Sequence, residues 1–442
     1  AMRAWLDNKG RGLFAMATGT GKTPTALYLA YKVTEKVSPC LIIVTCPYLN
    51  LARQWADSMF NFGLDPIHCY GSWTSWHNRL QDMLTALAVG ALPVAALVVT
   101  NATFLSDRFQ RLLASAGVPL FLIADEVHNL GAERLRTTLD DSIQYRLGLS
   151  ATPKRHLDED GTEALLKYFG GVVYEYTLAE AIESDVLCRY LYYPVLVDLT
   201  EDEGQTYWDI TTEIARQMHA GDGDGEMSTG LKFLLLKRAR LLGSAQNKLP
   251  TLRKILADLD TPIDRAIVYC GDGRVADDEE TDAEMIRQVE AATKMLGTDC
   301  GLRVRKFTFE ESMEEREDIL RLLKDGVIQA AVAIRCLDEG IDVPDVRMAF
   351  ILASSTNPRQ FIQRRGRLLR KATGKTRAHI WDFTIRPPDL GGKSDADTFN
   401  VERRLFQREL RRIVEFCKTA DNGDSALHTL QGLRSRYQVL DM

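Results

Sequence analysis

The chain has 442 residues, which is enough for about two to four domains, and 45% of them are hydrophobic and 26% charged. Its formal net charge of −6 excludes a globally basic nucleic-acid binder, so any contact with nucleic acid has to be confined to a local groove. No uncharged apolar run reaches the roughly 18 residues of a membrane span, and the eight cysteines include no C-x-x-C pair. We therefore expect a protein of the reducing cytoplasm, with no signal peptide and no membrane partner.

Short apolar runs alternate with helical patterns in the first part of the chain. Strands that are buried on both faces of a parallel sheet have this continuous hydrophobicity, and the segments between them are long enough for crossover helices. We therefore predict a doubly wound α/β lobe over residues 1–189. The predicted strands are Leu13–Ala15, Leu41–Thr45, Ala95–Thr100, Leu120–Ala124 and Tyr145–Leu149.

The second part of the chain repeats this pattern after a helical interval. In residues 190–255, Tyr207, Ile210, Ile214 and Met218 recur at helical spacing, which predicts a helical insert and linker. Residues 256–395 are predicted to form a second α/β lobe, and residues 396–442 a C-terminal helical tail that packs back onto a lobe. The predicted strands of the second lobe are Ala266–Cys270, Ala330–Ile334, Met348–Ala353 and His379–Phe383.

A glycine-containing loop lies between the first predicted strand and the helical stretch Ala26–Val33. Its glycines allow backbone N–H groups to approach phosphate oxygens, and the start of the helix adds a positive dipole. Lys22 would then reach the β- and γ-phosphates of ATP, and the Thr23 hydroxyl would bind Mg²⁺. Met16 stands where a strict phosphate-loop pattern has its first glycine. The residues expected to bind the nucleotide here are Thr18, Gly19, Thr20, Gly21, Lys22 and Thr23.

Two acidic residues, Asp125 and Glu126, directly follow the predicted strand Leu120–Ala124. Ligands of open α/β sheets bind at the carboxyl ends of the strands. Asp125 could hold Mg²⁺ through water, and Glu126 could orient and deprotonate an attacking water. Alone, such a pair is more often a solvated loop, but the phosphate loop 103 positions earlier favours the catalytic interpretation.

Five sequence motifs occur in the order that is typical of superfamily 2 helicases and translocases. The chain resembles these proteins over about residues 1–385. Within that superfamily the chain is most similar to the XPB-like branch and to the motor subunits of restriction and phage-defence systems. The resemblance implies two RecA-like lobes, with ATP hydrolysed between them. The motifs are Ala17–Thr23 (motif I), Asp125–His128 (the D-E-x-H box), Ser150–Thr152 (motif III), Glu339–Pro344 (motif V) and Gln363–Arg370 (motif VI).

The same resemblance assigns roles to residues of the second lobe. Arg367 and Arg370 match the two arginine-finger positions, and such a finger accelerates hydrolysis by about 10³–10⁵ in related NTPases. Gln363 is similar to the residue that touches the attacking water or the γ-phosphate. Gly340 and Asp342 would approach the ribose and the phosphates.

Other positions would connect ATP with nucleic acid. The resemblance implies that His128, Ser150 and Thr152 couple the ATP site to the nucleic-acid groove. Arg335 replaces a more usual small residue, and it is either a phosphate contact or a salt-bridged side chain. Trp73 and Trp76 could stack on bases, but core packing or a surface cap is the better expectation. Cys46-Pro47 with Gln54-Trp55 resembles motif Ia, Thr100-Asn101 resembles motif Ib, and Gly271 resembles part of motif IV. The residues expected to contact the tracked strand are Pro47, Gln54, Thr100, Asn101, Gly271 and Arg335.

These motifs predict an ATP- and Mg²⁺-dependent nucleic-acid motor, a DNA helicase or double-stranded DNA translocase. By resemblance we expect duplex DNA as its partner, and a nuclease domain or subunit of a restriction or phage-defence system as a further one. The alternatives are a regulatory ATP-binding scaffold and an RNA helicase. Because the chain begins with Ala1, we expect it to be part of a longer protein, in which a glutamine that reads adenine would precede this residue.

Overall fold

The computed structural model describes residues 1–130, 142–153, 158–220, 228–271, 288–308, 310–334, 345–353, 358–389 and 395–439. In these ranges the chain forms two compact units. Unit 1 comprises Ala1–Leu187, and unit 2 begins at Cys188. None of the helices in the described ranges is both long enough and apolar enough to span a bilayer.

The sheet of unit 1 has seven parallel strands in the described ranges, in the order β3-β4-β2-β5-β6-β1-β7. All five predicted strands of this lobe are present, which confirms the doubly wound fold class. The sequence pattern did not predict β3, which has only three residues, or β7, which is half-exposed at the edge of the sheet. The strands are β1 (Arg11–Met16), β2 (Cys40–Cys46), β3 (Ile67–Cys69), β4 (Val94–Thr100), β5 (Leu120–Ala124), β6 (Tyr145–Ser150) and β7 (Val172–Tyr176).

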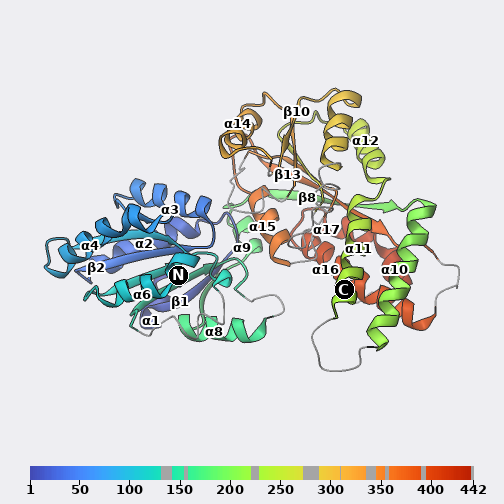
Figure 1. Cartoon of the computed structure of the whole chain (residues 1–442). Coiled ribbons are helices and arrows are strands. Elements are labelled where there is room, and N and C mark those ends of the chain that lie inside the picture. Colours follow the sequence, from blue (N-terminus) through green and yellow to red (C-terminus); the bar gives the residue numbers. More distant parts are fainter. Residues whose placement is uncertain are drawn as a thin grey trace. The chain divides into compact units, whose positions relative to one another are not determined.

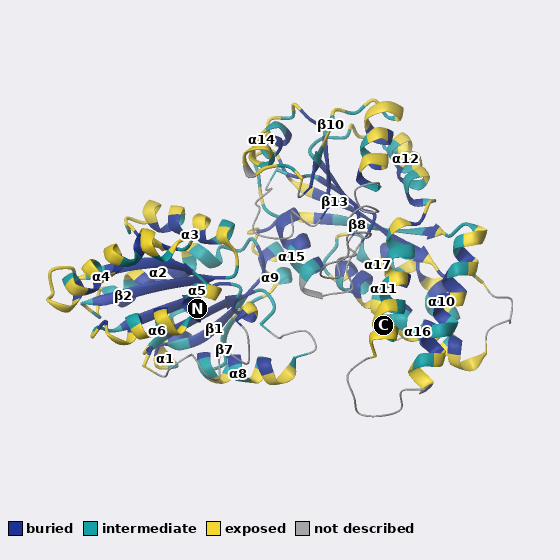
Figure 2. Cartoon of the chain, in the orientation of Figure 1, coloured by how far each residue is buried: buried dark blue, intermediate teal, exposed yellow. Residues whose placement is uncertain are grey.

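Helices cover both faces of this sheet (Figure 1). One apolar core packs α2 and α3 against the strands, and the other packs α4, α6 and α8 against the opposite face. The strands are therefore buried, whereas the outward sides of helices such as α3 and α4 are exposed (Figure 2). The helices are α1 (Met2–Asp7), α2 (Lys22–Thr34), α3 (Leu49–Asn61), α4 (Trp73–Ala88), α5 (Asn101–Phe104), α6 (Asp107–Ala114), α8 (Glu159–Phe169) and α9 (Leu178–Glu183), with a 3₁₀ turn η1 (Val127–Asn129).

The sheet of unit 2 has six parallel strands in the part that the structure describes, in the order β10-β11-β9-β12-β13-β8. The edge strand β8 lies in the segment that we expected to be a helical insert, and it pairs with β13 along its whole length. Its pattern was not recognised because it contains Pro194, which a strand tolerates at a sheet edge. The strands are β8 (Arg189–Asp198), β9 (Ala266–Tyr269), β10 (Val304–Phe307), β11 (Ala330–Ala333), β12 (Met348–Ile351) and β13 (Arg377–Arg386).

The helices α10 and α11, which follow β8, share a small apolar core with the C-terminal helix α16. Ile210, Ile214 and Ala215 of α10 pack there against Val401 of α16. The helical interval and the C-terminal tail therefore belong to one assembly within unit 2. The helices of this unit are α10 (Glu201–Ala220), α11 (Thr229–Ser244), α12 (Lys248–Asp258), α14 (Met313–Lys324), α15 (Pro358–Leu368), α16 (Ala396–Cys417), α17 (Gly423–His428) and α18 (Gln431–Arg436), with a π-helical turn η2 (Met295–Asp299).

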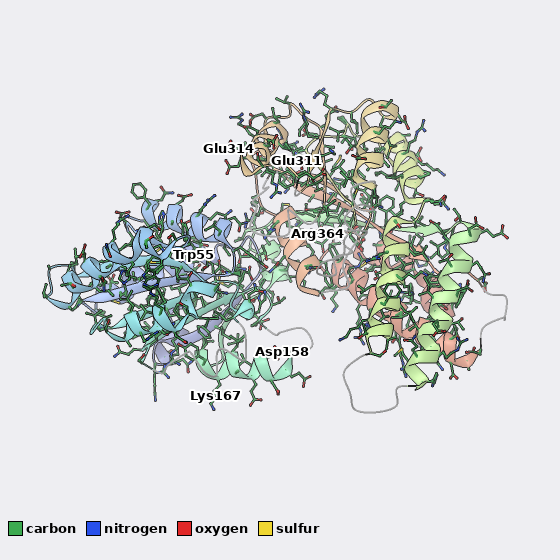
Figure 3. The ribbon with its side chains drawn as sticks, viewed as in Figure 1. Trp55, Asp158, Lys167, Glu311, Glu314 and Arg364 are labelled. Atoms are coloured by element: carbon green, nitrogen blue, oxygen red, sulfur yellow. The ribbon has the colours of Figure 1, made fainter. Side chains whose placement is uncertain are left out.

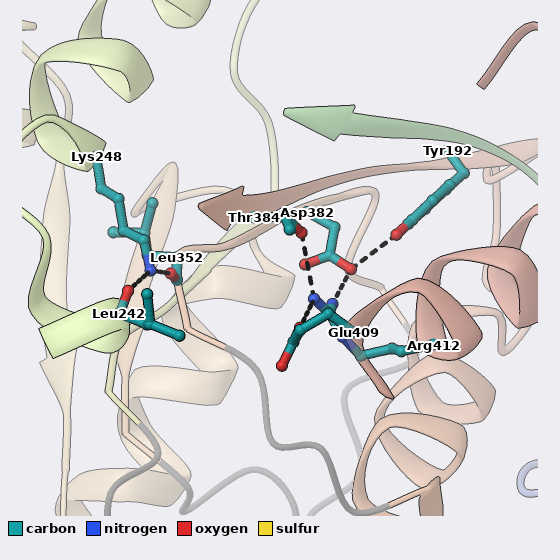
Figure 4. A network of polar contacts seen from close by, with 8 residues as sticks. All are labelled: Tyr192, Leu242, Lys248, Leu352, Asp382, Thr384, Glu409 and Arg412. Atoms are coloured by element: carbon teal, nitrogen blue, oxygen red, sulfur yellow. Dashed lines mark hydrogen bonds and ion pairs between the residues drawn. The ribbon is translucent and has the colours of Figure 1, made fainter. Parts of the chain in front are cut away.

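A buried polar network joins α16 to the sheet of unit 2 (Figure 4). Arg412 of α16 forms an ion pair with Asp382 of β13, and both side chains are almost fully buried. Asp382 also accepts a 2.7 Å hydrogen bond from the Tyr192 hydroxyl of β8, and Arg412 pairs with Glu409 at 2.8 Å. Because the buried charges are paired and hydrogen-bonded, the cost of removing them from water is offset.

A second buried cation in unit 2 is Lys248, at the start of α12 (Figure 4). Its ammonium donates to the carbonyl of Leu242 at 2.5 Å, near the end of α11, and to the carbonyl of Leu352, which follows β12. Both carbonyls lie near the end of a helix or a strand, where backbone acceptors lack the regular partners of secondary structure. Burial lowers the pKa of Lys248 to about 8.

Candidate nucleotide-binding site

The register of the sheet brings several predicted motifs of unit 1 to one edge. Ala15 of β1 is level with Ser150 of β6, and Thr45 of β2 is level with Ala124 of β5. Because all these strands are parallel, motifs I, Ia, Ib and III and the D-E-x-H box lie at carboxyl ends on the same edge. Parallel α/β sheets bind ligands in this position.

The loop between β1 and α2 has the backbone form of a phosphate cradle. Gly19 and Gly21 both have a φ of 86°, a left-handed conformation that glycine adopts without steric cost. The Thr20 hydroxyl closes the loop with a 2.7 Å hydrogen bond to the carbonyl of Ala17. Helix α2 then begins at Lys22, so its first N–H groups face the loop.

The ammonium of Lys22 lies 3.7 Å from Oε1 of Glu126. Its nitrogen is buried and has no hydrogen-bond partner among the described residues, and the same is true of the Thr18 hydroxyl oxygen. A buried ammonium normally has acceptors around it. Two buried polar groups beside this loop thus lack a hydrogen bond among the described residues, and the phosphate oxygens of a nucleotide would fit them.

Asp125 lies at the end of β5 and is only 5% exposed. The backbone N–H of Glu126 donates to its Oδ1 at 2.9 Å, and the indole N–H of Trp55 donates to its Oδ2 at 2.8 Å. Burial raises the pKa of this carboxyl, the neighbouring Glu126 acts in the same direction, and Lys22 and Trp55 oppose the shift. Carboxylate oxygens are ligands that suit a hard cation such as Mg²⁺, so Asp125 fits the role expected for it.

Glu126 adopts a left-handed backbone conformation, with φ 43° and ψ 50°. Such strain in a residue other than glycine is typical of functional sites. Here it places the carboxylate between two basic side chains, with Oε1 facing Lys22 and Oε2 lying 3.6 Å from Nδ1 of His128. The carboxylate is thus directed at the place where the phosphates are expected.

The three residues expected to couple ATP to nucleic acid form a contiguous chain. Nδ1 of His128 lies 3.0 Å from the Ser150 hydroxyl oxygen, which accepts a 3.1 Å hydrogen bond from the N–H of Thr152. The Ser150 hydroxyl therefore lies between the imidazole ring of His128 and the backbone of Thr152.

The residues of unit 1 that we expect to contact nucleic acid differ in exposure. Gln54 is exposed on α3, and Pro47 is half-buried. Asn101 is buried and accepts a 2.7 Å hydrogen bond from the Thr45 hydroxyl, whereas the Thr100 hydroxyl lies 3.2 Å from that of Thr103. Asn101 therefore links β4 to β2 inside unit 1 through this hydrogen bond. Contact with nucleic acid stays a prediction for all four positions.

Two tryptophans considered for base stacking are packed inside unit 1. Trp76 is 4% exposed in the core under α4. Trp73 packs against the same core, and the guanidinium of Arg108 lies 3.8 Å from the centre of its ring. The core-packing interpretation is therefore confirmed.

In unit 2, the arginines of motif VI differ from one another in their contacts. Arg365 of α15 donates to the carbonyl of Glu415 at 2.6 Å, and the guanidinium of Arg364 lies 4.5 Å from the ring centre of Tyr269. These two are held inside the unit. Arg367 and Arg370, which the motif pattern assigns as fingers, are buried and half-buried respectively.

Of the remaining predicted positions in unit 2, Gln363 is half-buried on α15. The N–H of Gly271 donates a 2.9 Å hydrogen bond to Oε1 of Gln288. Arg335, Gly340 and Asp342 lie outside the described residues, so their roles stay predictions.

One residue of this site was not connected with it by the sequence reasoning. Trp55 was noted only as part of motif Ia, yet its indole contacts Asp125, which is 70 positions away. No spacing rule relates two residues so far apart, and the position of Trp55 beside Gln54 was the only available signal.

Two family models match the chain. Residues 1–155 match the model described as "Type III restriction enzyme, res subunit", and residues 247–372 match "Helicase conserved C-terminal domain". Among curated relatives, the "DNA 3'-5' translocase XPB2" of Sulfurisphaera tokodaii is 28% identical over 84% of this chain and 77% of its own length. The "Putative DNA 3'-5' helicase Rad25" of Haloarcula marismortui is 24% identical over 83% of this chain and 49% of its own length.

Solved structures share the fold. The Pyrococcus furiosus Hef helicase domain matches 87% of this chain and 94% of its own, with a TM-score of 0.53 and 16% identity. A structure of the Type ISP restriction-modification enzyme LlaBIII bound to DNA matches 95% of this chain, with a TM-score of 0.60 and 16% identity, but only 29% of that enzyme is covered. Together with the edge geometry of unit 1, these matches place the chain in superfamily 2 of the helicases and translocases, related to XPB-like helicases and to the motor subunits of restriction enzymes.

Proposed function

We propose that the chain is an ATP-dependent DNA motor, a helicase or a double-stranded DNA translocase. The observation that carries the proposal is the convergence of Lys22, Asp125 and Glu126 at one edge of the sheet, beside a glycine loop. The buried ammonium of Lys22 faces Glu126 there and has no hydrogen bond among the described residues. A regulatory ATP-binding scaffold does not need a water-activating carboxylate, and Glu126 is held in a strained conformation that directs it to this place.

In the proposed reaction, Lys22 and the loop N–H groups bind the β- and γ-phosphates. Mg²⁺, held by the Thr23 hydroxyl and Asp125, would neutralise charge that develops on the phosphates. Glu126 orients the attacking water and accepts its proton. His128 is the neighbour that keeps the Glu126 carboxylate in place, since it lies within 3.6 Å of it.

Unit 2 would complete the reaction through motif VI. We assign Arg367 and Arg370 to the charge that develops on the γ-phosphate, and Gln363 to the attacking water or the γ-phosphate. Gly340 and Asp342 are assigned to the ribose and phosphates by the motif pattern alone. This assignment rests on the motif pattern, in which Arg367 lies near the end of α15 and Arg370 follows the helix.

Duplex DNA is the proposed substrate. XPB2 and Rad25 are named as a DNA translocase and a DNA helicase, and the LlaBIII structure contains DNA. The first family model is that of a restriction subunit, which supports a place beside a nuclease domain or subunit in restriction or defence against phages. The contacts to DNA are assigned to Pro47, Gln54, Thr100, Asn101, Gly271 and Arg335.

The test is the steady-state ATPase rate with duplex DNA, single-stranded DNA and RNA, at two salt concentrations. We expect duplex DNA to stimulate at least as well as single strands and RNA to stimulate least. Affinity for DNA should fall steeply with salt, with a log–log slope of several units if roughly 4–8 phosphates are neutralised. Robust hydrolysis that no polynucleotide changes would favour the regulatory scaffold instead.

A further inference from the structure

The indole of Trp55 points from α3 into the interior of unit 1 (Figure 3). The side chain is 1% exposed and packs in the core that α2 and α3 share with the sheet. Its Nε1 lies 2.8 Å from Oδ2 of Asp125. An apolar helix face is thus connected by one hydrogen bond to the carboxylate assigned to Mg²⁺.

This bond completes the orientation of the Asp125 carboxylate. The N–H of Glu126 donates to Oδ1, and the N–H of Trp55 donates to Oδ2, so each oxygen has one donor from the protein. A carboxylate held at both oxygens cannot rotate about its terminal bond, yet each oxygen retains a lone pair for a metal-bound water. Mg²⁺ requires near-ideal octahedral geometry, so the orientation of such an acceptor matters for its affinity.

Packing alone does not explain why this indole contacts a carboxylate. Trp5, which is also buried in unit 1, donates its N–H to the backbone carbonyl of Arg146 at 2.9 Å. The N–H of Trp76 is buried without a hydrogen bond among the described residues. The fold therefore accommodates a buried indole without any ionisable partner, and the pairing with Asp125 points to a role for the carboxylate.

We propose that Trp55 is a positioning residue for the Mg²⁺ ion of bound ATP, which it orients through Asp125. The proposal rests on the proposed function. Trp55 stands next to Gln54 on α3, where motif Ia is expected to meet DNA. A shift of α3 on DNA would therefore reach the metal-binding carboxylate through a single side chain.

The test compares Trp55→Phe with Trp5→Phe. Both substitutions keep a buried ring in unit 1 and remove one buried indole hydrogen bond of almost equal length, but only the first bond ends on a carboxylate. The measurement is equilibrium binding of a fluorescent ATP analogue as Mg²⁺ is titrated, with a parallel titration in EDTA. We expect the Mg²⁺ midpoint to rise about 10-fold or more in Trp55→Phe, as for other partners of metal ligands. Binding in EDTA should be unchanged, and Trp5→Phe should behave as the wild type.

A second measurement uses the wild-type protein, so it does not depend on whether Trp55→Phe folds. In protein labelled with ¹⁵N at its six tryptophans, Mg²⁺ added to the nucleotide-loaded state should shift the indole N–H resonance of Trp55 and leave that of Trp5 in place. Equal Mg²⁺ midpoints in the two variants, or an unshifted Trp55 resonance, would overturn the inference about Trp55 and leave the proposed function standing. A wild type that binds no nucleotide at any Mg²⁺ concentration would overturn the proposed function as well.

Discussion

Nδ1 of His128 lies 3.0 Å from the hydroxyl oxygen of Ser150, so the loop after β5 and the end of β6 are in direct polar contact. Both side chains are buried. His128 also faces the Glu126 carboxylate, and Ser150 accepts a hydrogen bond from the N–H of Thr152. A change in the position of motif III would therefore reach the Glu126 carboxylate through two contacts.

Ser150→Ala removes the link between these motifs and leaves the phosphate loop intact. We expect basal hydrolysis to stay within a few-fold of wild type, while the stimulation by DNA falls by about 5-fold or more, the usual size of a coupling between sites. ATPase rates with and without duplex DNA measure both. Ser115→Ala, at an exposed position of the same unit, is the control. If DNA stimulates hydrolysis in Ser150→Ala as strongly as in the wild type, the contact between Ser150 and His128 serves only the stability of the fold.

Lys22→Ala and Glu126→Gln should both abolish turnover, by different routes. Lys22→Ala removes the ammonium that is proposed to bind phosphate, so both the nucleotide affinity and the rate of ATP hydrolysis should fall. The second removes the base but keeps the shape of the side chain, so the rate should fall roughly 100-fold or more with affinity retained. Nucleotide titration and steady-state ATPase separate the two effects.

Lys32→Ala is the control for these variants, because Lys32 lies on the same helix and pairs at the surface with Glu35 at 2.9 Å. It should behave as the wild type in both measurements. Turnover within a few-fold of wild type in Glu126→Gln would refute the assignment of Glu126.

Arg367→Ala and Arg370→Ala should lower hydrolysis by about 10³ while ATP affinity changes little, because finger arginines act mainly in the transition state. Arg365→Ala, on the helix α15 that also carries Arg367, is the structural comparison. It loses the contacts to Glu415 and should lower the free energy of unfolding by roughly 1.5–3 kcal/mol. Equal losses of ATP affinity and rate in the finger variants would indicate a structural role for them too.

Arg412→Ala should destabilise unit 2, because it leaves the fully buried Asp382 carboxylate without its cation. Breaking such a pair typically costs about 3–5 kcal/mol. Urea unfolding followed by circular dichroism provides the measurement. Arg404→Ala, at an exposed position of the same helix, should change the free energy of unfolding by no more than about 0.5 kcal/mol. Equal stability of the two variants would show that water replaces the lost guanidinium.

The burial of Lys248 leads us to expect that the free energy of unfolding depends on pH. Its pKa is lowered from 10.5 to about 8 in the folded protein, chiefly by burial. Between these values the unfolded chain binds more protons than the native one, so the contribution of Lys248 to the free energy of unfolding rises with pH. Urea midpoints from pH 7.5 to 10.5 should increase more in the wild type than in Lys248→Met. The exposed Lys254 provides the matched control, Lys254→Met, which should follow the wild type.

Local patterns in the chain were sufficient to predict most of the strands and the loop between β1 and α2. Runs such as Leu41–Thr45 and Leu120–Ala124 have the continuous hydrophobicity of strands buried on both faces, and the glycines of the phosphate loop have few other uses between a strand and a helix. Such signals depend on neighbouring residues, so they can be recognised without the fold. Strands at sheet edges, such as β7 and β8, are partly exposed and lack this signal.

Only the folded chain reveals which distant side chains meet. Trp55 and Asp125 are 70 positions apart, and the hydrogen bond between them depends on how α3 packs on the sheet. Arg364 and Arg365 belong to motif VI, and only the fold shows that they contact Tyr269 and Glu415 inside unit 2. Whether an arginine faces a ligand or its own core is decided by burial and by long-range partners, and neither is recorded in the order of nearby residues.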